Sequence, residues 1–194
     1  MRKLIALVFH YSLNGLLADE GTEYYRFCFE LLDQGGGASH DDTSLEFLSG
    51  AHAHVMGRVA YEGISENLPA NPDHPWSQIL TAGHKVVFSR TMQNADWANT
   101  AIASGDTVEE IDRLRQGGDG HIIVWGGVTL WRSLMKLDLI DEWHLGLHPY
   151  IAHEGTRLFD DGEVPPSYRL DLASSTVFEN TGILELEYRR HRSG

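Results

Sequence analysis

The stretch His121–Leu134 constrains the fold of this chain more than any other part of the sequence. Its residues Ile122–Trp125 form an apolar run without polar alternation, which is typical of a strand buried on both faces. Gly126 and Gly127 follow at once, and apolar residues then recur at helical spacing, at Leu130, Leu134 and Leu137. The chain is therefore predicted to turn from a core strand directly into a helix. Backbone N–H groups at such a helix start favour phosphate, although close packing would also explain the two glycines.

The earlier part of the sequence alternates between similar strand-like and helix-like segments. Strands are expected at 3–9, 53–56, 85–91 and 100–103, and helices at 24–32, 43–50, 58–64, 76–80 and 107–116. Thr107 and Glu110 have the spacing of a capping box at the start of the last of these helices. This alternation predicts a mainly parallel sheet with helices on both faces.

The pattern changes after residue 142, where apolar and polar residues alternate over 143–148 and again over 184–188. Such alternation is typical of strands with one exposed face. The segment Glu179–Gly182 fits a hairpin turn, so the last two strands are predicted to be antiparallel. The open faces of these half-exposed strands, with Trp143 and Tyr188, are expected to form the contact of a homodimer. We expect one domain over residues 1–194.

Composition narrows the possible functions. The formal net charge of −13 disfavours a nucleic-acid backbone as partner, because association would begin against net repulsion. The longest apolar run, Leu4–Phe9, is too short to span a membrane, and no signal peptide is recognised, so a cytoplasmic protein is expected. Cys28 is the single cysteine and lies among aromatic residues, which indicates a small buried side chain and not a nucleophile.

Three predicted strands end in groups that suit an anion: Gly57-Arg58, Ser89-Arg90-Thr91 and Gly126-Gly127-Val128-Thr129. In a parallel sheet the carboxyl ends of the strands share one edge, where open α/β sheets bind ligands. Two helices that begin at glycine would hold a pyrophosphate, and the arginines and hydroxyls a further phosphate such as that of NADP. Each feature alone is also explained as a turn or an exposed helix residue, so the prediction depends on their convergence.

These residues belong to four longer motifs that occur in the order Met56–Glu62, Lys85–Thr91, Ile123–Leu130 and Leu139–Phe159. Together they resemble the dihydrofolate reductase superfamily, in the branch shared with the reductase domain of bacterial riboflavin biosynthesis. The resemblance implies a three-layer αβα sandwich with a mostly parallel central sheet, antiparallel C-terminal strands, and NADPH lying across the strand ends.

The resemblance also implies roles for individual residues. Contacts to the cofactor phosphates would come from Gly57, Arg58, Val59 and Ala60, and contacts to the adenosine 2′-phosphate from Ser89, Arg90 and Thr91. The pyrophosphate and nicotinamide ribose would lie against Gly126, Gly127, Val128, Thr129 and Leu130, and the nicotinamide against Leu17 and Ala18. The implied activity is an NADPH-dependent reduction of a small heterocyclic substrate, similar to a pterin or a ribosylaminopyrimidine, or of a carbonyl compound. A nucleotide-binding module without turnover is the alternative.

Neither of two landmarks of true dihydrofolate reductases is recognisable in Asp19–Leu32. They are the acidic residue that holds the pterin, on the helix after the first loop, and a proline-tryptophan pair before that helix. Folate is therefore not the expected substrate. The proton donor is not singled out by spacing, and the candidates are Glu30, Asp41, Asp42 and Glu154. No metal site is expected, because the pairs His52/His54 and His144/His148 have no third ligand at a recognisable spacing.

Overall fold

An eight-stranded sheet forms the centre of the computed structural model, which describes residues 1–33, 42–159, 162, 164–165 and 168–192. The strands are β1 (Leu4–Ser12), β2 (Ala51–Gly57), β3 (Lys85–Phe88), β4 (Thr100–Ala103), β5 (His121–Val124), β6 (Glu142–His148), β7 (Leu170–Phe178) and β8 (Ile183–Arg190). They lie in the order β4-β3-β2-β5-β1-β6-β8-β7. The pairs from β4 to β6 are parallel, whereas β8 is antiparallel to both β6 and β7.

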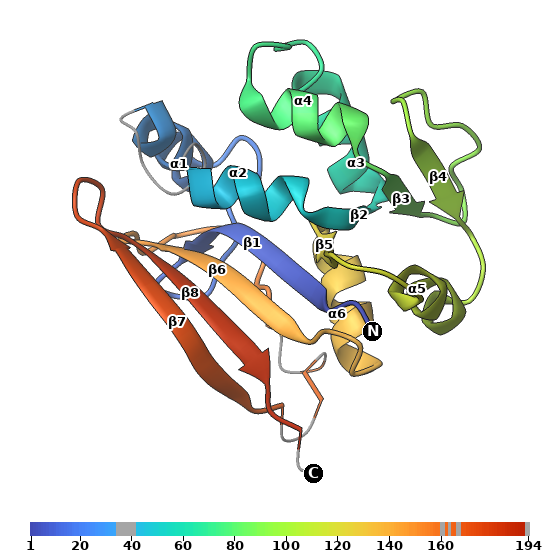
Figure 1. Cartoon of the computed structure of the whole chain (residues 1–194). Helices are drawn as coiled ribbons and strands as arrows, with labels where there is room; N and C mark the ends of the chain where they lie inside the picture. Colours follow the sequence, from blue (N-terminus) through green and yellow to red (C-terminus); the bar gives the residue numbers. More distant parts are fainter. Residues whose placement is uncertain (34–41, 160–161, 163, 166–167, 193–194) are drawn as a thin grey trace.

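Helices cover both faces of this sheet (Figure 1). They are α1 (Glu23–Asp33), α2 (Asp42–Ser49), α3 (Arg58–Asn67), α4 (Pro75–Ala82), α5 (Thr107–Arg115) and α6 (Val128–Lys136). One core lies between the sheet and α5 and α6, with Ile111 and Leu134 fully buried. A second core lies on the other face, where α2, α3 and α4 contribute Leu48, Tyr61 and Leu80. The predicted three-layer architecture is therefore confirmed, and so is the antiparallel C-terminal hairpin.

The central strands are apolar without alternation because both of their faces are covered. Ile122, Ile123 and Val124 of β5 are all fully buried, and they divide between the two cores. In contrast, β7 is exposed along most of its length, since no helix of the described residues covers it. All helices among the described residues are too short or too polar to cross a lipid bilayer.

Two predictions about the ends of elements were wrong. The strand expected at 85–91 ends at Phe88, and Ser89 begins a turn in which its Oγ accepts hydrogen bonds from the backbone of Thr91 and Met92. Helix α5 is capped by Asp106, whose carboxylate accepts from two backbone N–H groups, and not by Thr107. An aspartate already satisfies these N–H groups, so no capping box forms.

Trp143 is fully buried and donates through Nε1 to the hydroxyl of Tyr168 at 3.2 Å. The expectation that Trp143 lines an exposed subunit contact was therefore wrong. It lies on the face of β6 that packs against the core beneath α6. Alternation along a strand identifies two faces but does not say which of them another element covers.

Candidate functional site

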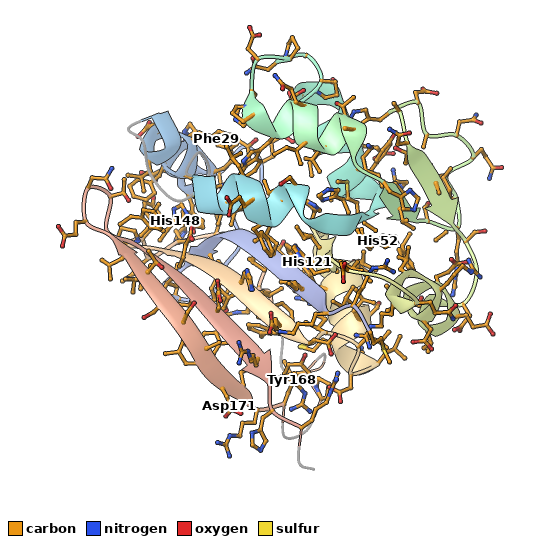
Figure 2. All side chains as sticks on the ribbon, in the orientation of Figure 1. Phe29, His52, His121, His148, Tyr168 and Asp171 are labelled. Carbon is orange, nitrogen blue, oxygen red and sulfur yellow. The ribbon has the colours of Figure 1, made fainter. Side chains whose placement is uncertain are left out.

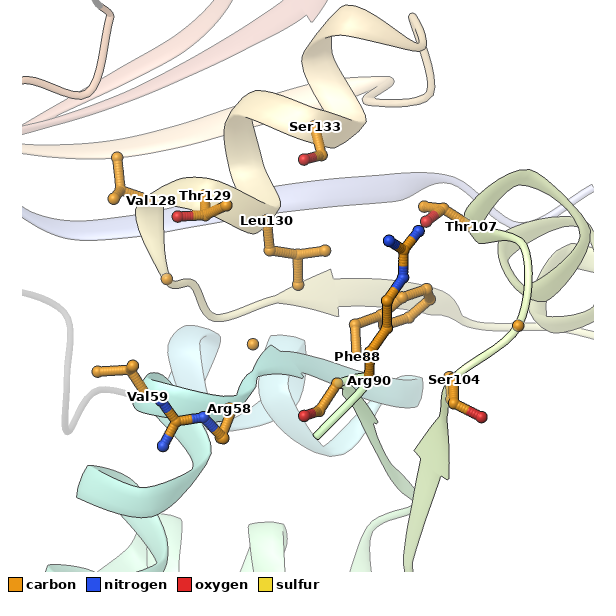
Figure 3. A pocket seen from close by; sticks show the side chains of 15 residues that line it. Arg58, Val59, Phe88, Arg90, Ser104, Thr107, Val128, Thr129, Leu130 and Ser133 are labelled. Carbon is orange, nitrogen blue, oxygen red and sulfur yellow. The ribbon is translucent and has the colours of Figure 1, made fainter. Parts of the chain in front are cut away.

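A pocket of about 530 Å³ lies at the carboxyl ends of β2, β3, β4 and β5 (Figure 3), a size that suits part of a nucleotide. Nine of the residues predicted from the sequence line it: Gly57, Arg58, Val59, Ser89, Arg90, Gly127, Val128, Thr129 and Leu130. The structure thus brings together segments that are far apart in the sequence, at the edge where open α/β sheets bind ligands.

Two turns meet at the floor of this pocket, one between β2 and α3 and the other between β5 and α6. The N–H of Gly57 donates to the carbonyl oxygen of Gly126 at 2.6 Å. A Cβ on Gly57 would lie 3.1 Å from the backbone nitrogen of Gly127, which is tighter than ordinary contact, whereas a Cβ on Gly127 would meet nothing within 4 Å. Gly57 therefore permits the close approach of the turns, and the space over Gly127 is open to a ligand. The peptide bond between Gly126 and Gly127 is cis.

Both helices that begin at these turns have N-termini without a side-chain cap. Gly57 is the N-cap of α3 and Gly127 the N-cap of α6, and neither first turn contains an acidic residue. Such N-termini carry partial positive charge and free N–H groups, so together they suit an anion. Helix α5 differs, because the Asp106 carboxylate already occupies its N-terminus.

The charges around the pocket are those of an anion site in an otherwise acidic protein. Two arginines and no carboxylate are found among the described residues that line it. Arg58 forms an exposed ion pair with Glu62 of the same helix at 2.8 Å. No carboxylate of the described residues pairs with Arg90, whose side chain extends across the pocket towards Thr107 (Figure 3). Arg90 is therefore the cation with the most freedom to bind a phosphate.

Five of the predicted site residues do not line the pocket. Gly126 is buried and contributes its carbonyl to Gly57, while Ala60 lies on α3 and packs against the second core. Thr91 is exposed beyond the Ser89 turn. Leu17 forms a bridge with Tyr11 after β1, and Ala18 packs near Tyr24 and Cys28. Leu17 and Ala18 thus lie beside the end of β1, away from the four strand ends that form the pocket.

Sequence reasoning missed six lining residues: Phe88, Ala103, Ser104, Gly105, Thr107 and Ser133. Four of them follow or end β4, which was recognised as a strand. The residues after β4 could have been predicted as part of the site, because the carboxyl end of a fourth parallel strand reaches the same edge of the sheet. Ser104 and Thr107 add hydroxyl groups to the side of the pocket that Arg90 approaches.

The proton-donor candidates are not gathered at the pocket. Glu30 on α1 and Glu154 after β6 are both exposed, and neither lines it. Asp41 lies outside the described residues, and so does the side chain of Asp42. Cys28 is fully buried, as predicted, and burial raises the pKa of its thiol to about 12.

This sheet, with its pocket at the strand ends, defines a protein of the dihydrofolate reductase-like fold. A dihydrofolate reductase from Enterococcus faecalis, solved in complex with NADP(H) and RAB-propyl, matches 98% of this chain and 97% of its own with a TM-score of 0.59 at 17% identity. That likeness concerns the fold. The chain belongs to the RibD C-terminal domain family, whose model matches residues 6–184. The resemblance inferred from the four motifs is thereby confirmed.

Three further proteins are similar to this chain. A "Putative riboflavin biosynthesis protein" from Shewanella sp. PV-4 matches with a TM-score of 0.72 at 25% identity, over 98% of this chain and 99% of that chain. A "pyrimidine reductase-like protein" from Corynebacterium diphtheriae matches with a TM-score of 0.64 at 16% identity, over 99% and 93%. In sequence, the "Uncharacterized protein YyaP" of Bacillus subtilis (strain 168) is 28% identical over 148 residues, which are 74% of this chain and 76% of that protein.

Proposed function

We propose that this protein is an NADPH-dependent reductase of a small heterocyclic substrate, similar to a pterin or a ribosylaminopyrimidine, or of a carbonyl compound. The observation that supports this most directly is the pocket, which lies between two helix N-termini without a side-chain cap. Among the residues that the structure describes, no carboxylate lines it and none pairs with Arg90. Membership of the RibD C-terminal domain family supports a reductase, and NADP(H) in the Enterococcus dihydrofolate reductase supports the cofactor. A role in riboflavin biosynthesis is part of the same proposal.

In this proposal the dinucleotide lies in one direction across the strand ends. The pyrophosphate would lie between the N-termini of α3 and α6, over the open space at Gly127. The 2′-phosphate would lie at Arg90 and Ser89, near the hydroxyls of Ser104 and Thr107. NADPH would supply the hydride, and the protein would orient the nicotinamide beside the end of β1, where Leu17 and Ala18 lie.

The first experiment measures binding of NADPH and NADH through tryptophan fluorescence. Trp125 directly precedes Gly126 and is mostly buried, so a ligand at this turn is expected to change its emission. We expect saturable quenching with NADPH and weaker binding of NADH. If neither dinucleotide binds, the proposal is wrong.

The second experiment follows oxidation of NADPH at saturating cofactor with dihydrofolate, pterins, ribosylaminopyrimidines and simple carbonyl compounds. Oxidation that depends on one class of substrate would support the reductase and identify that class. Saturable binding without oxidation across all of them would favour the alternative, a nucleotide-binding module of the same fold.

A further inference from the structure

Three side chains with metal-binding atoms meet beneath α1, apart from the nucleotide pocket. One nitrogen of His10, one nitrogen of His148 and the Sγ of Cys28 all lie within 4.8 Å of one another. Cys28 is fully buried and His148 is 2% exposed. Aromatic rings surround the group, because His10 lies beside Phe29 and His148 makes an edge contact with Tyr24. Figure 2 shows His148 and Phe29 at this end of the molecule.

An irregularity in the sheet brings the two histidines onto one face. Val8 pairs with Leu145, but the next pair is Tyr11 with Leu147, so β1 contains one extra residue at this point. After the bulge Ser12 pairs with His148, and His10, two residues before Ser12, therefore shares the face of His148. The two rings are 5.2 Å apart, and His10 Nδ1 lies 3.4 Å from His148 Nε2.

A glycine on β6 makes this arrangement possible. A Cβ on Gly146 would lie 2.3 Å from the carbonyl oxygen of Phe9, a distance that no real side chain tolerates. The carbonyl therefore approaches β6 only because residue 146 has no side chain. It also lies 3.1 Å from His148 Nε2, so it contributes to the position of that imidazole.

This contact determines which nitrogen of His148 is available. A carbonyl oxygen only accepts hydrogen bonds, so Nε2 of His148 carries the proton and Nδ1 has the lone pair. Among the described residues Nδ1 of His148 is buried and has no hydrogen-bond partner. A buried acceptor without a partner is costly, unless another group binds there. Ligating histidines in metal sites commonly donate their other ring N–H to a backbone carbonyl, as His148 does here.

We propose that His10, Cys28 and His148 form a binding site for a thiophilic cation of the zinc type. A thiolate and two neutral imidazoles are ligands that zinc prefers, and three of them leave one position for water or another oxygen donor. The cation would connect α1 to β1 and β6, where α1 otherwise packs in a small cluster with Leu16 and Ala152. Cys28 would bind as the thiolate, so one proton leaves to solvent for each ion bound.

The test uses the full chain, stripped with a chelator and then titrated with Zn²⁺ or Co²⁺. We expect native mass spectrometry to show one Zn²⁺ per chain and the midpoint of thermal unfolding to rise. Co²⁺ is expected to give a sulfur-to-metal charge-transfer band, which requires Cys28 because it is the single cysteine.

Cys28→Ser and His148→Gln are the test variants, and His52→Asn is the matched control. His52 is exposed near the start of β2, which lies three strands away from β6 in the sheet, and Figure 2 shows the two histidines well separated. We expect both test variants to lose the bound ion and the thermal shift, and the control to keep them. Circular dichroism of the stripped variants shows whether they fold, and the Co²⁺ spectrum of the unaltered chain tests the site independently of any variant.

Zinc bound equally well by Cys28→Ser would overturn the proposal, since the ion would then be on surface histidines. A Co²⁺ complex without the charge-transfer band, or no metal bound at equimolar concentration, would overturn it as well. The last result would mean that the three side chains only pack together, as expected for a small polar group within an apolar cluster.

Discussion

Arg90 is the residue on which the preference for NADPH over NADH depends in the proposed function. Its guanidinium has no ion-pair partner among the described residues and lies beside Ser89 at the end of β3. A charged hydrogen bond to phosphate contributes about 1.5–3 kcal/mol. We therefore expect Arg90→Ala to weaken NADPH binding roughly 10- to 100-fold and to leave NADH nearly unchanged, as measured by fluorescence titration.

The substitution Arg58→Ala is the matched control for Arg90→Ala. Arg58 lies at the start of α3, and its guanidinium is held by Glu62. If the pyrophosphate lies there, NADPH and NADH share the contact, so the substitution should weaken both by a similar factor. If Arg90→Ala weakened the binding of NADPH and NADH by a similar factor, the assignment of the 2′-phosphate to Arg90 would be wrong.

His54 makes the stability of the protein depend on pH. The side chain is 1% exposed, and its Nδ1 accepts a hydrogen bond from Trp125 Nε1 at 3.0 Å. Burial, and then the charge of Lys85, lowers the pKa of His54 from 6.5 to about 4. The folded state therefore favours the neutral ring, so its contribution is complete above pH 6.5 and is lost as the pH falls towards 4.

This difference between the pKa of His54 in the folded protein and its ordinary value corresponds to roughly 3 kcal/mol in the free energy of unfolding. We expect urea unfolding at pH 7 and pH 4.5 to show a clear loss of stability on acidification. His54→Gln, which keeps an acceptor for Trp125 but does not titrate in this range, should reduce that loss. An equal loss in the variant would show that other groups, such as the half-buried His10, account for the dependence.

At the scale of elements, the contact between the β2–α3 turn and the β5–α6 turn forms the floor of the pocket. Gly57→Ala would place a Cβ 3.1 Å from the Gly127 nitrogen and 3.7 Å from the Leu130 Cβ, so the turns must separate by a few tenths of an ångström. We expect a loss of about 1–3 kcal/mol in the free energy of unfolding. Weaker dinucleotide binding should accompany it.

Gly63→Ala is the control on the same helix. Gly63 lies within α3, and a Cβ there would meet nothing within 4 Å. Alanine is the better helix former, so the free energy of unfolding of this variant should rise by about 0.5–1 kcal/mol. Its dinucleotide binding should be unchanged. If both substitutions changed stability in the same direction, the close approach at Gly57 would not be the cause.

For the whole molecule, we propose that two copies of the chain meet through the exposed face of β7 and β8. Leu172 and Val177 are 58% and 60% exposed, and they pair with the half-buried Tyr188 and Leu184, which places all four on one face. Strand β7 is also the edge of the sheet, where unpaired backbone groups attract another strand.

Light scattering after size-exclusion chromatography is expected to give the mass of a dimer. The double substitution Leu172→Glu and Val177→Glu should shift it to that of a monomer. Ile151→Glu changes an apolar residue that is 74% exposed in the segment after β6, and it should leave the dimer intact. A monomer in the unaltered chain would contradict the proposal.

The sequence by itself determined the features that depend on local backbone chemistry. Ile122–Val124 was recognisable as a core strand because residues covered on both faces do not alternate. Gly57 and Gly127 were recognisable as starts of helices because the apolar period changes directly after them. The edge at which these turns meet followed from the parallel order of strands, which alternation with helices requires.

Only the tertiary structure decided what depends on long-range pairing. The meeting of His10, Cys28 and His148 requires a bulge in β1 and a glycine on the neighbouring strand, and no local pattern specifies either. Burial of Trp143 likewise depends on which face of β6 the neighbouring elements cover. Periodicity shows that a strand has two faces, but strand register and packing determine which side chains on those faces come into contact.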